Sequence, residues 1–126
     1  MHELSIAEGI IEIVERTAAA NDVRSVRAVR VAIGELAGVD IPSLEFAWES
    51  VRKGGVAENA VLEIERPKGE AWCLDCCRTV PMARYGDPCP TCGGYRLTAT
   101  GGTEMRVIEL IERTPDGENS NEERDS

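Results

Sequence analysis

The sequence predicts an α+β fold, in which two helices lie on a small three-stranded mixed sheet that carries an inserted cysteine-rich module. Two stretches with helical spacing of apolar residues alternate with short stretches of strand-like alternation. A strand–helix–strand run over 26–66 can form a right-handed parallel crossover, which places two strands side by side. All five cysteines fall within residues 73–92, between ordinary globular stretches.

The first predicted helix covers residues 5–20. Ser5 and Glu8 fit a capping box at its start, and Asn21 and Asp22 close it. Its apolar positions form two adjacent rows at helical spacing, Ile6, Ile10, Ile13 and Thr17 beside Ala7, Ile11, Val14 and Ala18.

Residues 26–33 then alternate as a half-buried strand does. One face carries Val29, Val31 and Ile33, and the other carries Arg30 and Ala32.

A second helix follows a turn region that contains Gly34 and Gly38. Asp40 is its predicted cap, and Pro42 is tolerated in its first turn. Its inner stripe comprises Leu44, Trp48 and Val51, and it ends at Gly54-Gly55.

Two further strands complete the predicted sheet. Residues 61–66 place Leu62 and Ile64 inward, and residues 104–112 form the last strand after Gly101-Gly102. The predicted domains are residues 1–68 with 102–114, the inserted module 69–101, and an acidic tail 115–126. The tail has no apolar residue, so we expect it to be disordered.

The charge balance limits the classes of partner. Against 14 basic side chains stand 23 acidic ones, a net charge of −9, which argues against a nucleic-acid-binding protein. No apolar run approaches the ~20 residues of a membrane span, and the first residues lack the pattern of a signal peptide. We therefore expect a cytoplasmic protein, in which reduced cysteines favour a metal site over disulfides.

The cysteines form two knuckles, Cys73-x2-Cys76 and Cys89-x2-Cys92. This spacing predicts a tetrahedral four-thiolate site in a zinc-ribbon-like module. Four protein ligands close the coordination sphere, so the site should be structural, with Zn(II) as first choice and rubredoxin-like iron as second. A redox-active dithiol pair or plain buried thiols are less favoured, because the knuckles lie in Pro/Gly-rich surroundings without helical periodicity.

Cys77 is the odd cysteine, directly after Cys76. It is either a free thiol near the metal or a replacement for Cys76 as ligand, which would break the two-residue spacing.

His2 is the only histidine of the chain. A terminal histidine is usually frayed and without function. Here, however, the α-amine of Met1, the amide nitrogen of His2 and its imidazole can close fused chelate rings on one ion. The amide of Glu3, or a carboxylate, can supply a fourth donor, and planar nitrogen donors suit Ni(II) or Cu(II).

Several motifs together resemble the HypA/HybF family of hydrogenase nickel-insertion metallochaperones over residues 1 to about 112. They are Met1-His2-Glu3-Leu4-Ser5-Ile6-Ala7, Ile33-Gly34-Glu35-Leu36, the two cysteine knuckles with Gly93, and Gly102-x-Glu104-Met105. His2 and Glu3 match the family's nickel motif, and Cys73, Cys76, Cys89 and Cys92 match its zinc ligands. Cys77 departs from the non-thiol residue expected after the first knuckle.

The resemblance implies a chaperone that binds nickel at its N-terminus and zinc in a separate module. It implies handover to the large subunit of a [NiFe]-hydrogenase with help from the nickel-handling GTPase HypB; some relatives also serve urease, with urease maturation proteins as partners. Monomer and homodimer both stay open.

We therefore expect a nickel carrier and not an enzyme. No G-x4-G-K-[ST] motif occurs, and a single terminal histidine cannot build a Ser/His/Asp set. The rivals are a zinc ribbon that binds nucleic acid or protein, and a rubredoxin-like redox protein.

Overall fold

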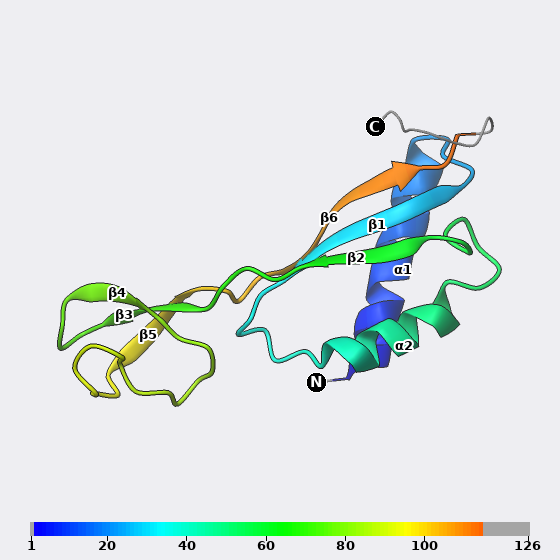
Figure 1. Cartoon of the computed structure of the whole chain (residues 1–126). Helices are drawn as coiled ribbons and strands as arrows, with labels where there is room; N and C mark the ends of the chain where they lie inside the picture. Colours follow the sequence, from blue (N-terminus) through cyan, green and yellow to red (C-terminus); the bar gives the residue numbers. More distant parts are fainter. Residues whose placement is uncertain (1, 115–126) are drawn as a thin grey trace. The chain divides into compact units, whose positions relative to one another are not determined.

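The computed structural model describes residues 2–114 of the chain. It contains two helices and six strands in the order α1-β1-α2-β2-β3-β4-β5-β6 (Figure 1). The strands form two separate three-stranded sheets, ordered β2-β1-β6 and β4-β3-β5. The predicted acidic tail, 115–126, lies outside the described residues.

The chain divides into two compact units. The first comprises the chain up to Arg30, Asp40–Glu63 and the chain from Val107 on; the second comprises Val31–Val39 and Ile64–Arg106. The predicted domain limits stay a prediction.

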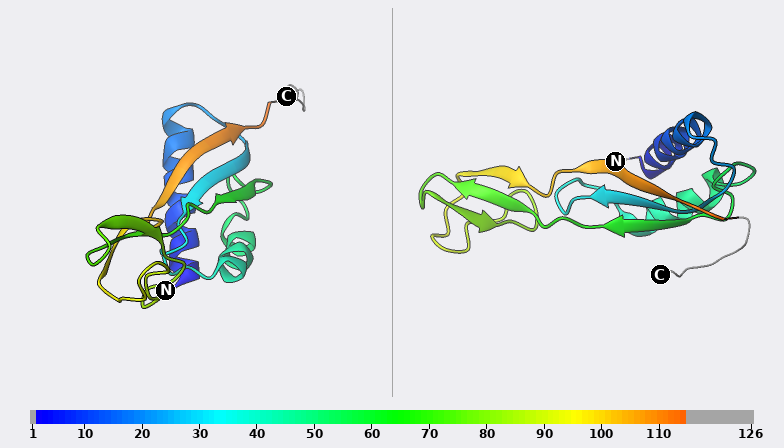
Figure 2. Two further views of the ribbon diagram at one scale, coloured as in Figure 1. Left: turned by 60° about the vertical axis from the view of Figure 1, so that its left-hand side comes forward. Right: turned by 90° about the horizontal axis from the view of Figure 1, so that it is seen from above.

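The first sheet contains β1 (Val26–Ile33), β2 (Val61–Glu65) and β6 (Met105–Glu112). β1 and β2 run parallel and are joined through α2, while β6 runs antiparallel to them, so the sheet is mixed, as predicted (Figures 1 and 2). The predicted strand positions are confirmed to within one residue. Both helices lie on one face of this sheet (Figures 1 and 2).

α1 (Glu3–Ala20) begins two residues before the predicted start. His2 is its N-cap and makes no side-chain capping bond, so the predicted capping box at Ser5 is wrong. The longer helix gains a backbone hydrogen bond from the Ile6 N–H to the His2 carbonyl (3.1 Å), and it places Glu3 in the first turn, where the helix dipole favours an acid. Its buried stripe is Ala7, Ile10, Val14 and Ala18, whereas Ile13 and Thr17 are exposed.

α2 (Ile41–Val51) has Asp40 at its N-cap position and Pro42 in its first turn, as predicted, but the Asp40 side chain makes no capping hydrogen bond. The helix ends at Val51, before the Gly54-Gly55 pair that was predicted to end it. Leu44, Ala47 and Trp48 are its buried residues, while Val51 is half-buried. The buried Trp48 indole N–H donates to the Ala60 carbonyl (3.0 Å), which ties α2 to the chain just before β2.

β1 is more deeply buried than a half-buried strand. Ala28 and Ala32 are buried along with the valines and Ile33, and β1 is the central strand of its sheet. Arg30, on the alanine side, lies between Glu63 of β2 (3.6 Å) and Glu109 of β6 (2.6 Å). This ion pairing links all three strands.

The second sheet contains β3 (Glu70–Cys73), β4 (Arg78–Pro81) and β5 (Leu97–Gly101). β3 is central and pairs antiparallel with both neighbours. The sequence predicted the cysteine module but not these three strands. Two small groups of buried side chains pack on this sheet, and Leu97 contacts both of them. The first group is Leu36, Ala71 and Met82; the second is Cys73, Val80 and Cys89.

Three glycines of the second unit bring chain segments into close backbone contact. A Cβ on Gly34 would overlap the carbonyl of Gly102, and a Cβ on Gly102 would lie 2.6 Å from the Gly69 Cα. Around this point the Gly34 N–H donates to the Glu104 carbonyl (2.8 Å) and the Leu36 N–H to the Gly102 carbonyl (2.7 Å). Glycine is therefore required by the space between the backbones at these positions.

Within residues 2–114, neither helix combines the length and apolar character that a bilayer crossing needs.

We predict that Gly34→Ala lowers the free energy of unfolding by about 2–3 kcal/mol, because the added methyl must displace backbone. The matched control is Gly9→Ala: a Cβ at Gly9, inside α1, would meet nothing within 4 Å. There the same change should raise stability by about 0.5–1 kcal/mol. Urea unfolding of the zinc-loaded chain measures both, and equal effects of the two substitutions would contradict the packing argument.

Candidate metal centre

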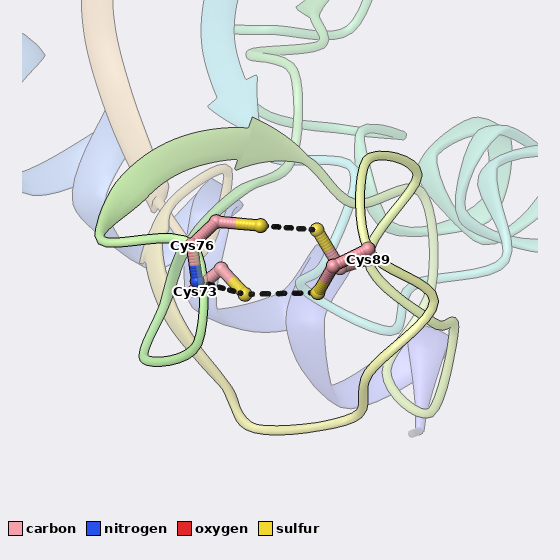
Figure 3. Close-up of side chains that lie close together, drawn as sticks. Cys73, Cys76 and Cys89 are labelled. Carbon is pink, nitrogen blue, oxygen red and sulfur yellow. Dashed lines mark hydrogen bonds between the residues drawn. The ribbon is translucent and has the colours of Figure 1, made fainter.

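The four cysteines of the two knuckles converge on one point. Cys73 lies at the end of β3 and Cys76 in the turn after it, while Cys89 and Cys92 lie in the segment before β5. Their sulfur atoms all lie within 4.8 Å of one another. Figure 3 shows Cys73, Cys76 and Cys89 directed toward this common point.

The sulfur–sulfur distances fit a tetrahedral cation site. Cys73 Sγ lies 3.8 Å from Cys92 Sγ, and Cys76 Sγ lies 3.8 Å from Cys89 Sγ. Four sulfurs about 2.3 Å from one zinc ion, at the corners of a tetrahedron, lie about 3.8 Å apart. All five cysteines carry free thiols, and the donor set is consistent with zinc.

Backbone amides surround the sulfurs. The N–H of Cys76 donates to Cys73 Sγ (3.3 Å), that of Thr91 to Cys89 Sγ (3.4 Å), and that of Gly94 to Cys92 Sγ (3.4 Å). Amide donors favour thiolate over thiol, as a cation site requires.

Hydrogen bonding also distributes the protons unevenly among the thiols. The backbone N–H of Cys92 lowers the pKa of Cys89 to about 6, whereas side-chain hydrogen bonding with Cys92 raises the pKa of Cys76 to about 12. A cation binds thiolates, so binding releases protons from the thiols and affinity should fall as the pH drops.

The two knuckles have the same backbone geometry. In the first, the Cys77 N–H donates to the Cys73 carbonyl (2.8 Å), and in the second, the Gly93 N–H donates to the Cys89 carbonyl (2.8 Å). Both donors have left-handed backbone, with φ of 55° at Cys77 and 76° at Gly93. Cys77 therefore occupies the position that glycine occupies in the second knuckle.

The sulfur of Cys77 points away from the cluster. It is exposed and lies 3.7 Å from the Leu74 carbonyl, while Cys76 contributes its sulfur to the group of four. This geometry favours Cys76 over Cys77 as the ligand. No described helix contains a cysteine or begins directly after one, so a dithiol activated by a helix N-terminus is not present in residues 2–114.

The predicted nickel residues lie in the other unit. Met1 lies outside the described residues, and His2 is exposed immediately before α1. The carboxylate of Glu3 accepts a hydrogen bond from the backbone N–H of Asp40 (2.9 Å), and the Asp40 carboxylate accepts one from the Ser43 hydroxyl. The sequence singled out Asp40 only as a helix cap, since nothing local indicates its contact with a residue 37 positions away.

A family model described as "Hydrogenase/urease nickel incorporation, metallochaperone, hypA" matches residues 1–111. The chain belongs to the HypA family. Members of this family are metallochaperones for nickel incorporation into hydrogenase and urease, and not enzymes.

Curated HypA proteins agree closely with this chain. The hydrogenase maturation factor HypA of Cupriavidus necator is 45% identical over 111 residues, covering 88% of this chain and 93% of the relative. The hydrogenase maturation factor HypA of Azotobacter vinelandii is 49% identical over 110 residues, covering 87% of this chain and 97% of the relative. The solution structure of the Ni metallochaperone HypA from Helicobacter pylori matches with a TM-score of 0.63 and 32% identity, covering 89% of this chain and 97% of that one.

We predict that Cys77→Gly keeps one zinc per chain and raises stability by about 1 kcal/mol, because glycine adopts the left-handed backbone without steric cost. Cys77→Ala is the matched control: it removes the same thiol, retains the Cβ and should give no gain. Zinc content and urea unfolding of the purified variants measure both effects.

Cys76→Ser should lose the zinc that Cys77→Gly retains. If Cys76→Ser kept its zinc while the Cys77 variants lost theirs, Cys77 and not Cys76 would be the fourth ligand.

Proposed function

We propose that this HypA protein carries Ni(II) at its N-terminus and holds a resident Zn(II) in its cysteine cluster. The nickel ligands are the Met1 amine, the His2 amide and imidazole nitrogens and the Glu3 amide. The zinc ligands are Cys73, Cys76, Cys89 and Cys92. The position of His2 as the N-cap of α1 is the observation that carries the nickel assignment. Nickel is the cargo, whereas zinc stabilises the second unit.

The start of α1 leaves backbone nitrogen available for a metal. The first N–H groups of a helix have no partner within the helix, and the first such bond here comes from Ile6 to the His2 carbonyl. The amides of His2 and Glu3 can therefore lose their protons to a metal without breaking a helical hydrogen bond. Planar nitrogen donors of this kind suit Ni(II).

The Glu3 carboxylate already has a role within the protein. Its hydrogen bond from the Asp40 N–H joins the start of α1 to the start of α2. This contact supports a model in which Glu3 contributes its amide to nickel while its carboxylate holds the N-terminal segment in place. It also brings a second acidic residue, Asp40, next to the predicted nickel motif.

The zinc ion has a structural role in this proposal. Four thiolates leave no open position for a substrate, and the buried groups packed on the sheet β4-β3-β5 are small. A sheet with so little apolar packing gains much of its folding free energy from metal binding.

Delivery requires partner proteins. The chain has no phosphate-binding loop, so nucleotide hydrolysis must come from another protein, for which we propose the GTPase HypB. The proposed acceptor is the large subunit of a [NiFe]-hydrogenase, with urease maturation proteins as a second destination. The family description of hydrogenase and urease nickel incorporation supports both destinations.

We predict that a short Gly-Ser extension before Met1 abolishes specific binding of one nickel per chain, because it converts the amine into a peptide nitrogen. The same extension after Ser126 is the control and should have no effect. Isothermal titration of the zinc-loaded protein with nickel measures both, and unchanged affinity in the N-terminally extended protein would exclude the amine as a ligand.

Nickel affinity of the unextended protein should also fall between pH 8 and pH 6, since the amine and amide donors must lose protons to bind. Titrations at several pH values, with total nickel corrected for buffer binding, test this. A flat profile would contradict amine and amide coordination.

We predict that Glu3→Gln retains nickel affinity within about threefold, because an amide oxygen can still accept the Asp40 N–H and the backbone nitrogen is unchanged. Glu3→Ala removes that acceptor and should weaken binding by loosening the N-terminal segment. A loss of tenfold or more in Glu3→Gln would instead identify the carboxylate as a direct ligand.

A further inference from the structure

A groove in the first unit lies between α2 and the start of β2. It has a volume of about 520 Å³, and its apolar lining includes Phe46, Trp48, Val61 and Leu62. Phe46 is 80% exposed and Val61 is 61% exposed, although both are large apolar side chains. We call this surface the β2-edge groove. It contains none of the residues assigned above to either metal.

The groove runs along an open sheet edge. In the order β2-β1-β6, β2 pairs with β1 on one side, and no described strand pairs with its other side. An unpaired strand edge presents backbone N–H and C=O groups to another extended chain. The exposed apolar lining and the open edge therefore suit one occupant, an extended segment that adds as a further strand.

Side-chain alternation in β2 specifies the pattern of that segment. Leu62 is half-buried, whereas Val61 and Glu63, which alternate with it, are exposed. In an added strand, alternate residues would face Leu62 and Phe46, and the residues between them would lie beside Glu63. The side chains that face Leu62 and Phe46 should be apolar, and those that lie beside Glu63 should be basic.

Acidic side chains outnumber basic ones on the groove lining, although Glu49 is ion-paired with Arg52 and Glu63 of β2 with Arg30. Glu45 and Glu49 line it from α2, and Arg52 on the same lining is 2.6 Å from Glu49. A second copy of this chain fits poorly, because antiparallel pairing of two β2 strands centred on Glu63 would place the two Glu63 side chains opposite each other. Charge complementarity thus favours a basic partner.

We propose that the β2-edge groove is a docking site for an extended segment of a partner protein in which apolar and basic residues alternate. The segment pairs with the open edge of β2, its apolar side chains contact Phe46 and Leu62, and its basic side chains lie beside Glu63 on the other face. The proposal does not rest on either metal assignment.

The test is an NMR titration of the zinc-loaded, 15N-labelled full chain with a short acetylated peptide of alternating lysine and valine. The amide signals of residues 61–65 and of α2 should shift, and affinity should fall with added salt. The control peptide has the same composition with the lysines and valines in separate blocks. Equal binding of the block peptide, shifts centred on β6, or no binding would overturn the proposal.

Two variants with matched controls locate the site. Phe46→Ser and Glu63→Lys should each weaken binding by about tenfold, as loss of a central contact or reversal of a nearby charge does. Ile13→Ser removes another exposed apolar side chain, beside β6, and Glu8→Lys reverses a charge on α1; both should leave binding unchanged. Circular dichroism verifies that each variant is folded. Equal effects of the test and control variants would contradict the assignment.

A third peptide distinguishes strand pairing from simple charge attraction. Methylation of alternate backbone nitrogens of the lysine–valine peptide keeps its charge and side chains but removes the donors that face β2. Its binding should be lost. If it binds as well as the parent peptide, the segment does not add to the sheet.

Discussion

The close passage of three backbones at Gly34, Gly69 and Gly102 is the constraint on which the second unit depends. The segment after β1, the segment before β3 and the segment before β6 meet here, and side chains of Glu35 and Arg66 reinforce the meeting. Glu35 accepts the Gly69 N–H (2.8 Å), and Arg66 donates to the Ile33 carbonyl (2.7 Å). The two ends of the cysteine-bearing insert are thereby fixed at one place, so an insert of this length can leave the chain and return without disturbing the order of the first sheet.

Beyond that closure, the cysteine-bearing sheet β4-β3-β5 has little apolar packing to stabilise it. Its buried groups are small, and two of the cysteines are themselves part of the buried surface. The four sulfurs are arranged by two knuckles of the same geometry, each closed by an N–H from a left-handed residue. The first unit, by contrast, has a conventional core around Trp48, Leu44 and Val14. The protein thus joins one unit stabilised by apolar packing to one whose geometry suits stabilisation by a cation.

Features encoded by local pattern were predictable from the sequence, and features that depend on distant contacts were not. The helices, the strands of the first sheet and the cysteine cluster follow from spacing alone. Helix α1 starts earlier than predicted because Glu3 is acceptable in the first turn, which the Ser5 motif obscured. The strands of the second sheet are only four or five residues long, too short for alternation to be distinct. The contact of Glu3 with Asp40 and the glycine crossing join residues far apart in sequence, so no periodicity indicates them.

The distance along the chain between β1 and β6 has a consequence for the order of folding. Arg30 of β1 is joined to Glu109 of β6 across 79 residues, so the first sheet cannot be completed until β6 has left the ribosome. Until then β1 has an open edge, and closing so long a loop carries a substantial entropy cost. If the cysteine-bearing insert has already bound its cation, and its two ends already meet at Gly34, Gly69 and Gly102, the loop between β1 and β6 is effectively shorter. Supply of the metal during synthesis would then influence how fast the other half of the protein reaches its native state, and how long it is exposed to aggregation.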